Sequence, residues 1–278
     1  MPDILLHLAF PILASILYAG LGWHFWRTRW HRPAPGSKNA MMPAERFGIA
    51  VALLLQGLGL HDALFGAGGM RFSFGLALSL MLWLAALIYW LESFRSRMDG
   101  LQPAVLPVAA ICALFPVFFP QTRTIAHADA FGFKLHFLAA MLAYSLFTLS
   151  AAHAVFMSAV EKKLHQKPLS PILNSLPPLL RMETLLFQLI GAGFILLSVA
   201  LGSGILFSET IFGQAMRIDH KTVFAFASWM VFAALLAGRH IYGWRGRMAL
   251  RWTMTGFLFL LLAYVGSRFV IEVLLERL

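Results

Sequence analysis

The chain has 278 residues, of which 60% are hydrophobic and only 12% are charged. A soluble domain is nearer one half apolar, so this composition excludes an ordinary soluble protein and indicates an integral membrane protein. The net charge of +10 resides in short basic clusters between apolar runs, a pattern that sets membrane topology and excludes nucleic acid as a partner.

Eight apolar runs follow one another along the chain, each close to the roughly 20 residues that a helix needs to cross a bilayer. The runs are continuous and lack the alternation of a membrane barrel. They therefore predict an all-α bundle of about eight transmembrane helices in a single membrane domain, residues 1–278. The expected spans are 4–26, 47–64, 73–91, 102–120, 134–159, 183–206, 221–238 and 252–273.

Basic residues between the runs predict the orientation of the chain. One set of loops holds fifteen of the 22 lysines and arginines and is therefore expected to be cytoplasmic. This orientation places both termini outside. The fifteen are Arg27, Arg29, Arg32, Lys38, Arg46, Arg95, Arg97, Lys162, Lys163, Lys167, Arg181, Arg239, Arg245, Arg247 and Arg251.

Four histidines lie at the ends of spans on the predicted outer side: His61, His127, His136 and His220. A neutral imidazole ligates iron through one nitrogen while its other N–H is held by a hydrogen-bond acceptor, and three of the four have an aspartate nearby in sequence. For each histidine alone, interfacial solvation or a structural hydrogen bond is an alternative. The set as a whole predicts a ligand site for haem iron or another metal.

His136 differs from the others because it lies about one helical turn inside its span, where an imidazole needs a partner. His153, seventeen residues later, is about 25 Å further along the same helix and can serve only a second, inner site. The aspartate before His220, Asp219, has an alternative role as the N-cap of the seventh helix.

Haem also requires cations for its propionates and an apolar surface for its ring. Lys221 and Arg268 on the predicted outer side are candidates for the propionates, although Arg268 can also extend to the interface as an ordinary snorkelling side chain. The single cysteine, Cys112, lies in an apolar run and there is no CxxCH motif, so any haem is expected to be non-covalent haem b.

Several short stretches of the second half occur in a characteristic order. They are Leu135-His136, Tyr144-Ser145, Gly202-Ser203-Gly204, Asp219-His220-Lys221-Thr222, Trp229, Gly243-Trp244-Arg245-Gly246 and Ala263-Tyr264-Val265-Gly266. In this order the chain resembles the membrane domain of cytochrome c assembly proteins of the CcsA/ResC type, and more closely their YpjD/HemX-like branch. The part expected to be assembly-like is 102–273.

The resemblance implies a haem-handling protein of the bacterial inner membrane, in which histidines ligate haem during delivery to apocytochrome c. The family's external histidine corresponds to His136, and His220 is the next candidate for the iron. The chain departs from the family in two places: the segment 209–218 contains no tryptophan, and the partner histidine after the last span is absent. We expect His61, His127 or His220 to replace that ligand.

The sequence and the resemblance therefore predict one function and leave one alternative to it. The first is a non-catalytic haem-binding factor of cytochrome c biogenesis, whose partners are the bilayer, haem and other biogenesis proteins. The second is a HemX-like membrane scaffold or regulator of tetrapyrrole metabolism without bound haem, acting through the basic loop around Arg245 and Arg247. Enzymatic activity is not expected, because the HxxH or HxxxH clusters of diiron membrane oxidases do not occur.

Overall fold

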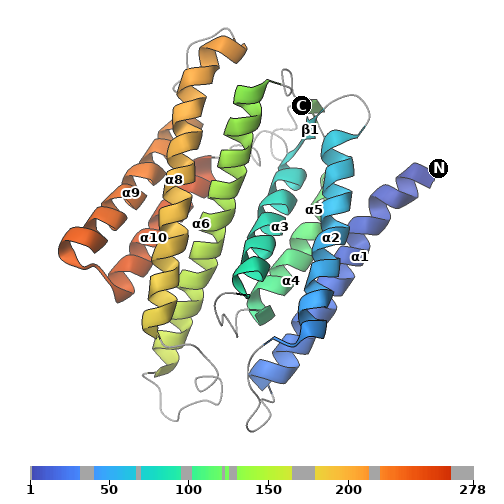
Figure 1. Cartoon of the computed structure of the whole chain (residues 1–278), viewed down its shortest axis with the longest axis horizontal. Coiled ribbons are helices and arrows are strands. Elements are labelled where there is room, and N and C mark those ends of the chain that lie inside the picture. The colour runs from blue at the N-terminus through green and yellow to red at the C-terminus, as the bar shows by residue number, and fades with distance from the viewer. Residues whose placement is uncertain are drawn as a thin grey trace. The chain divides into compact units, whose positions relative to one another are not determined.

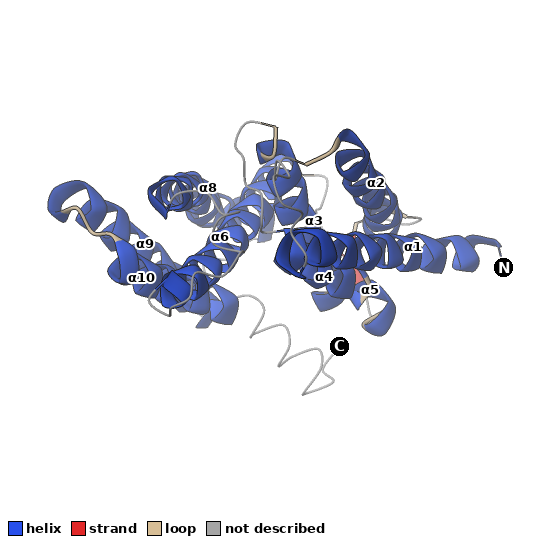
Figure 2. Ribbon diagram, turned by 90° about the horizontal axis from the view of Figure 1, so that it is seen from below, coloured by secondary structure: helices blue, strands red, loops and turns tan. Residues whose placement is uncertain are grey.

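The computed structural model describes residues 2–31, 41–66, 70–94, 102–120, 123–124, 130–164, 179–212 and 220–263. Helices make up nearly all of this part of the chain (Figure 2). Six of them are long and apolar enough to cross a membrane, so the prediction of an all-α integral membrane protein is confirmed. These six are Leu8–Arg29, Pro43–Phe65, Phe74–Glu92, Phe131–Lys162, Leu179–Leu206 and His220–Tyr242.

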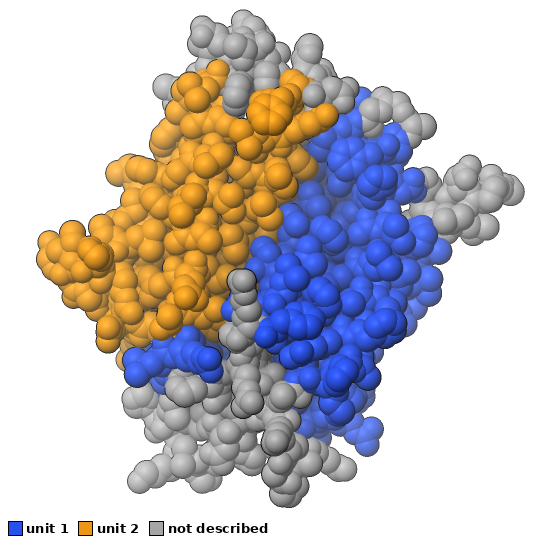
Figure 3. Space-filling model, in the orientation of Figure 1, with its two compact units in different colours: residues 1–124, 156–182 blue, residues 125–155, 183–278 orange. Residues whose placement is uncertain are grey.

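The chain divides into two compact units, residues 1–124 with 156–182 and residues 125–155 with 183–278 (Figure 3). The first unit contains α1 (Pro2–Phe25), the π-helical η1 (Trp26–His31), α2 (Pro43–Phe65), β1 (Arg71–Phe72), α3 (Phe74–Glu92), α4 (Gln102–Ala113), α5 (Phe115–Phe118) and β2 (Arg123–Thr124). The second unit holds most of α6 (Phe131–Leu164) and α8 (Leu179–Phe212), together with α9 (His220–Tyr242) and α10 (Gly246–Leu261).

In the first unit, α1 packs against α2 and α4, and α3 packs against α2 and α4 (Figure 1). The core between them is apolar and includes Tyr18, Ile49 and Leu106, each almost fully buried. Tryptophan N–H groups join the helices at two depths. Trp83 donates to the Leu53 carbonyl at 2.7 Å, and Trp90 donates to the Arg46 carbonyl at 3.0 Å.

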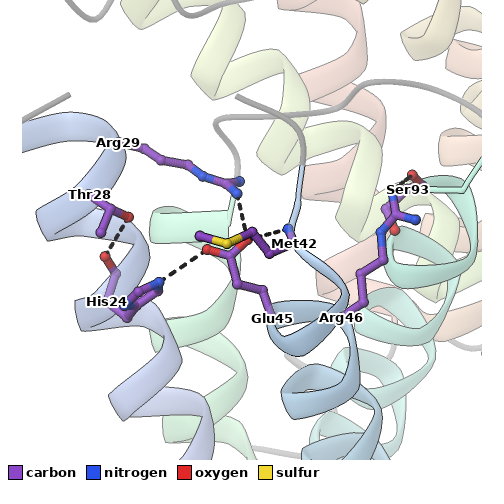
Figure 4. A network of polar contacts seen from close by, with 7 residues as sticks. All are labelled: His24, Thr28, Arg29, Met42, Glu45, Arg46 and Ser93. Atoms are coloured by element: carbon purple, nitrogen blue, oxygen red, sulfur yellow. Dashed lines mark hydrogen bonds and ion pairs between the residues drawn. The ribbon is translucent and has the colours of Figure 1, made fainter. Parts of the chain in front are cut away.

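A buried carboxylate organises one end of this unit (Figure 4). Glu45 in the first turn of α2 is 7% exposed and accepts from Arg29 Nη2 at 2.8 Å, from His24 Nε2 at 3.1 Å and from the Met42 backbone N–H at 2.8 Å. The bond from Met42 satisfies a helix-terminal donor, as in a capping box. Glu45 therefore fixes the start of α2 against the end of α1 at the predicted cytoplasmic side.

The expected fourth span, 102–120, is two short helices. α4 ends at Ala113 and α5 begins at Phe115, with Pro116 in its first turn. Proline has no N–H to bond the preceding turn, so it favours a new helix start at this point. The remaining expected span, 252–273, starts inside α10, which begins at Gly246, and its residues from 264 lie outside the described part.

In the second unit, aromatic rings and hydroxyl groups join the helices. Phe147 of α6 stacks on Phe232 of α9 at 3.9 Å between ring centroids, and Ser228 of α9 donates to the Gly256 carbonyl of α10 at 2.9 Å. Trp229 donates to Ser198 of α8 at 2.8 Å. α6, α8, α9 and α10 thus form a helix bundle joined by stacked rings and by hydrogen bonds of hydroxyl and indole groups, as expected between transmembrane helices.

Two antiparallel residue pairs join β1 and β2, and these are the only strands in the described ranges. Helix α6 runs past the expected 134–159 at both ends, and its extension carries Glu161 and Lys162, which a helix can keep beyond the apolar core of a bilayer. The outside location of both termini stays a prediction.

Candidate functional site

His136 lies on α6, one turn after the helix begins at Phe131, and its side chain is half-buried. Its Nδ1 is 3.0 Å from the carbonyl oxygen of Ala200 and 3.2 Å from the hydroxyl oxygen of Ser203, both on α8. A carbonyl oxygen can only accept, so Nδ1 carries the proton and donates it to Ala200. The nitrogen with the free lone pair is therefore Nε2.

The His136 imidazole packs against small residues of α8. Ser203 is buried, and its hydroxyl donates to the Ala200 carbonyl at 3.0 Å. At Gly204, an added Cβ would lie 3.3 Å from His136 Cε1, which is tighter than most contacts of real Cβ atoms, and 3.6 Å from its Nδ1, which is an ordinary contact. We call His136, Ala200, Ser203 and Gly204 the His136 site; its orientation is fixed by a hydrogen bond and by close packing.

The donors at this site can be compared with what haem iron and a bare metal ion each require. Within the described ranges, no group of three or more His, Cys, Asp or Glu side chains could hold a metal ion. A bare ion such as zinc requires about four protein ligands. Haem iron requires only one or two axial ligands, and an imidazole whose other N–H is held by a carbonyl is the usual form of such a ligand. The His136 imidazole therefore has the chemistry of an axial ligand to haem iron.

The other predicted residues lie in different settings. His220 is the exposed first residue of α9, followed by the half-buried Lys221, in the same unit as His136. His61 is exposed near the end of α2, in the first unit, with its ring 5.5 Å from that of Phe65. His127 and Arg268 lie outside the described residues. Among the four predicted residues that lie in the described part of the chain, His136 is the one whose ring hydrogen-bonds to a neighbouring helix.

Residue-type reasoning about the histidines did not find Ala200, Ser203 or Gly204 as their partners. A signal for them exists in the sequence, because Gly202-Ser203-Gly204 is one of two stretches of small residues in this apolar run, the other being Gly191-Ala192-Gly193. Small residues inside a transmembrane helix mark a close approach by a neighbouring helix. The pattern contains no information on which helix approaches.

The Gly243-Trp244-Arg245-Gly246 stretch forms the turn between α9 and α10. Gly243 and Gly246 have φ of +68° and +57°, the left-handed region that favours glycine. Trp244 folds back so that its backbone N–H donates to the Gly238 carbonyl at 3.2 Å, and its ring lies 5.2 Å from that of Trp252. The motif therefore has a structural role as a helix-to-helix connection.

This turn is also tied to α8 by an ion pair. Arg239 Nη1 bonds the Glu183 carboxylate and lies 3.3 Å from the Trp244 carbonyl. Arg245 Nε is 3.8 Å from the same carboxylate, and the Arg245 side chain is 63% exposed. Glu183 thus joins three helices at the end of the unit that the charge pattern predicts to be cytoplasmic.

Comparison with known proteins gives the family. The sequence profile of the family described as "Cytochrome C assembly protein" matches residues 51–275. The chain belongs to the cytochrome c assembly protein family. Every residue of the His136 site lies inside the matched segment, as do His61, His127, His220, Lys221 and Arg268. The Glu45 carboxylate and its partners precede it.

Three relatives show how this member compares with others. The chain is 32% identical over 213 residues to the "Uncharacterized 28.8 kDa protein in nifR3-like 5'region" of Azospirillum brasilense, covering 74% of this chain and 78% of that one. It is 30% identical to "Inner membrane protein YpjD" of Escherichia coli (strain K12), covering 63% and 66%. It is 38% identical to "Cytochrome c biogenesis protein CcsA" of Prochlorococcus marinus (strain MIT 9215), covering 32% and 29%. No solved structure matches the chain.

Proposed function

We propose that this family member is a non-catalytic haem-binding protein of cytochrome c biogenesis, located in the bacterial inner membrane, in which His136 ligates haem b through Nε2. The observation that carries the proposal is the bond from His136 Nδ1 to the Ala200 carbonyl at 3.0 Å. This bond holds the tautomer and ring direction that an axial ligand requires. Family membership supports the role in cytochrome c biogenesis.

The second axial ligand is His220, His61 or His127. We favour His220 over His61, because His220 belongs to the same unit as His136 and is exposed at the start of α9. Lys221, beside it, and Arg268 are the proposed cations for the propionates. The only cysteine, Cys112, is buried in α4 and offers no thioether attachment, which is why the haem is proposed to be non-covalent.

The test is an absorbance spectrum of the protein purified in mild detergent and titrated with haem b. We expect a saturable Soret band that is strongly reduced in His136→Ala. His240, exposed at the other end of α9, provides the matched control, since His240→Ala removes a histidine that is not proposed as a ligand. Single replacements of His220, His61 and His127 then identify the second ligand. No Soret band, or equal losses in the His136 and His240 variants, would contradict the proposal.

A second candidate is a membrane scaffold of tetrapyrrole metabolism without bound haem. Arg245 and Arg247 are both exposed at the start of α10, as is the apolar Met248 beside them, so this edge can dock an acidic partner. Replacement of both arginines by Gln should reduce recovery of a co-purifying partner. Recovery that is unchanged in the double variant would count against the scaffold.

A further inference from the structure

One face of α10 is exposed, while the opposite face packs against α9 (Figure 1). The packed face includes Gly256, whose carbonyl accepts from Ser228 of α9 at 2.9 Å. The exposed positions are three or four residues apart, so their side chains lie one above another along the helix. We call them the exposed α10 face: Arg247, Arg251, Met254, Thr255 and Leu258.

The exposed α10 face changes from cationic to apolar along its length. Arg247 and Arg251 are one helical turn apart at the end that the charge pattern predicts to be cytoplasmic, and the exposed Met254 and Leu258 follow them. The sequence of α10 contains no aspartate or glutamate. Like charges four residues apart on a helix repel each other. An anion held between the two guanidinium groups would therefore stabilise this turn.

Aromatic rings beside the arginines indicate the level of the membrane surface. Trp252 follows Arg251 directly, and its ring lies 5.2 Å from that of Trp244, which lies 6.3 Å from the ring of the exposed Tyr242. Tryptophan and tyrosine gather at the membrane–water interface, where an apolar ring with a polar edge is most stable. The arginines are therefore at the level of lipid headgroups. Leu258 is about 10 Å further along the helix axis, within the roughly 15 Å of one leaflet.

We propose that the exposed α10 face binds an anionic phospholipid of the phosphatidylglycerol type. The lipid phosphate lies between Arg247 and Arg251, since a guanidinium group can donate two hydrogen bonds to phosphate oxygens. One acyl chain runs along Met254 and Leu258 toward the middle of the bilayer. A cationic turn followed by an apolar row matches the order of phosphate and acyl chain in such a lipid. This site is independent of haem binding at His136.

The test is native mass spectrometry of the whole protein in detergent, titrated with phosphatidylglycerol or with phosphatidylcholine of the same acyl chains. We expect the first phosphatidylglycerol to bind at least about tenfold tighter, because each arginine near a membrane surface contributes about a fivefold preference for an anionic lipid. The double variant Arg247→Gln/Arg251→Gln should bring the two affinities to within about twofold. Equal affinities in the wild-type protein, or an unchanged preference in the double variant, would overturn the proposal.

Arg181 provides the matched control. It is exposed in the first turn of α8, also at the predicted cytoplasmic side, and the exposed residues that follow it on its face, Thr184 and Gln188, are polar. Arg251→Gln should lower the preference for phosphatidylglycerol about fivefold, whereas Arg181→Gln removes the same charge and should keep it. Equal losses in these two single variants would show that the preference comes from net charge and not from the exposed α10 face.

A competition with the wild-type protein does not depend on how the variants fold. Glycerol 3-phosphate carries the phosphate of the lipid without its acyl chains. If the apolar row contributes to binding, glycerol 3-phosphate should displace phosphatidylglycerol only at concentrations at least about a hundredfold above that of the lipid. Displacement at equal concentrations would contradict the assignment of a lipid and indicate a site for a soluble phosphate.

Discussion

The imidazole of His136 on α6 is held by the carbonyl of Ala200 on α8, sixty-four positions away in sequence, at 3.0 Å. This bond assigns the two ring nitrogens, since Nδ1 donates and Nε2 keeps its lone pair. Nothing in the local sequence around His136 provides that assignment. The bond depends on α8 presenting small residues at the level where the histidine lies.

The first prediction concerns Gly204. In Gly204→Ala, the new Cβ would lie 3.3 Å from His136 Cε1, so the ring must shift. A disturbed support of a ligating histidine typically weakens metal affinity tenfold or more, and we expect about a tenfold loss of haem affinity in a Soret titration. Gly202→Ala is the matched control, because no described atom lies within 4 Å of its Cβ position. Equal affinities in the two variants would show that Gly204 does not position the ring.

The second prediction concerns Glu183, which bonds Arg239. The Arg239 side chain is 26% exposed and the Glu183 side chain 11% exposed, so solvent replaces the bond poorly. Glu183→Ala should lower the free energy of unfolding in detergent by about 1.5–3 kcal/mol. Arg245→Ala, which removes an exposed partner at 3.8 Å, should cost less than about 1 kcal/mol. Equal unfolding temperatures of Glu183→Ala and Arg245→Ala would show that the ion pair between Glu183 and Arg239 does not stabilise the fold.

The third prediction concerns the turn between α9 and α10. At φ of +68° and +57°, a Cβ on residue 243 or 246 meets the following carbonyl, and Gly243→Ala or Gly246→Ala should destabilise the protein by about 1–2 kcal/mol. Asn in place of Gly243 should cost less, since Asn tolerates this region better. Gly191→Ala within α8 serves as the control, because its Cβ meets no described atom within 4 Å. Thermal unfolding in detergent measures all four variants.

The fourth prediction concerns Glu45 in the first unit. Its carboxylate accepts from Arg29, from His24 and from the backbone of Met42. Because Glu45 and Arg29 are both buried, Glu45→Ala should lower the free energy of unfolding by about 3 kcal/mol, with Glu45→Gln intermediate. Thr28→Ala removes an exposed hydroxyl that bonds only the His24 carbonyl, and should change it by less than about 0.5 kcal/mol. Equal effects of Glu45→Ala and Thr28→Ala would contradict this account.

The helices could be predicted from the sequence because the length and continuity of an apolar run depend only on local composition. The break at Leu114 could not be placed in this way, since hydropathy is the same on both sides and the proline at 116 acts through a missing N–H. The early start of α10 was missed for a similar reason. Gly246, with its positive φ, begins that helix among arginines that a hydropathy count excludes.

His136 could be singled out from the sequence because depth within a span follows from counting residues. The residues that hold its ring could not be predicted, because the pairing of α6 with α8 is a tertiary contact between residues 136 and 200–204. The structural role of Gly243 and Gly246 could not be predicted from the sequence for another reason. Their motif pointed to the family, whereas the positive φ angles show that its glycines are required by the backbone of a turn.

If His136 ligates haem through Nε2, free imidazole should restore the haem spectrum of His136→Gly, and this chemical rescue tests the assignment of the ligand. The protein is titrated with haem b in detergent and the Soret band is recorded with and without imidazole. We predict a weakened or shifted band in His136→Gly that returns to the wild-type position and intensity when imidazole occupies the space of the lost side chain. A wild-type Soret band in His136→Gly without imidazole would show that His136 does not ligate the haem.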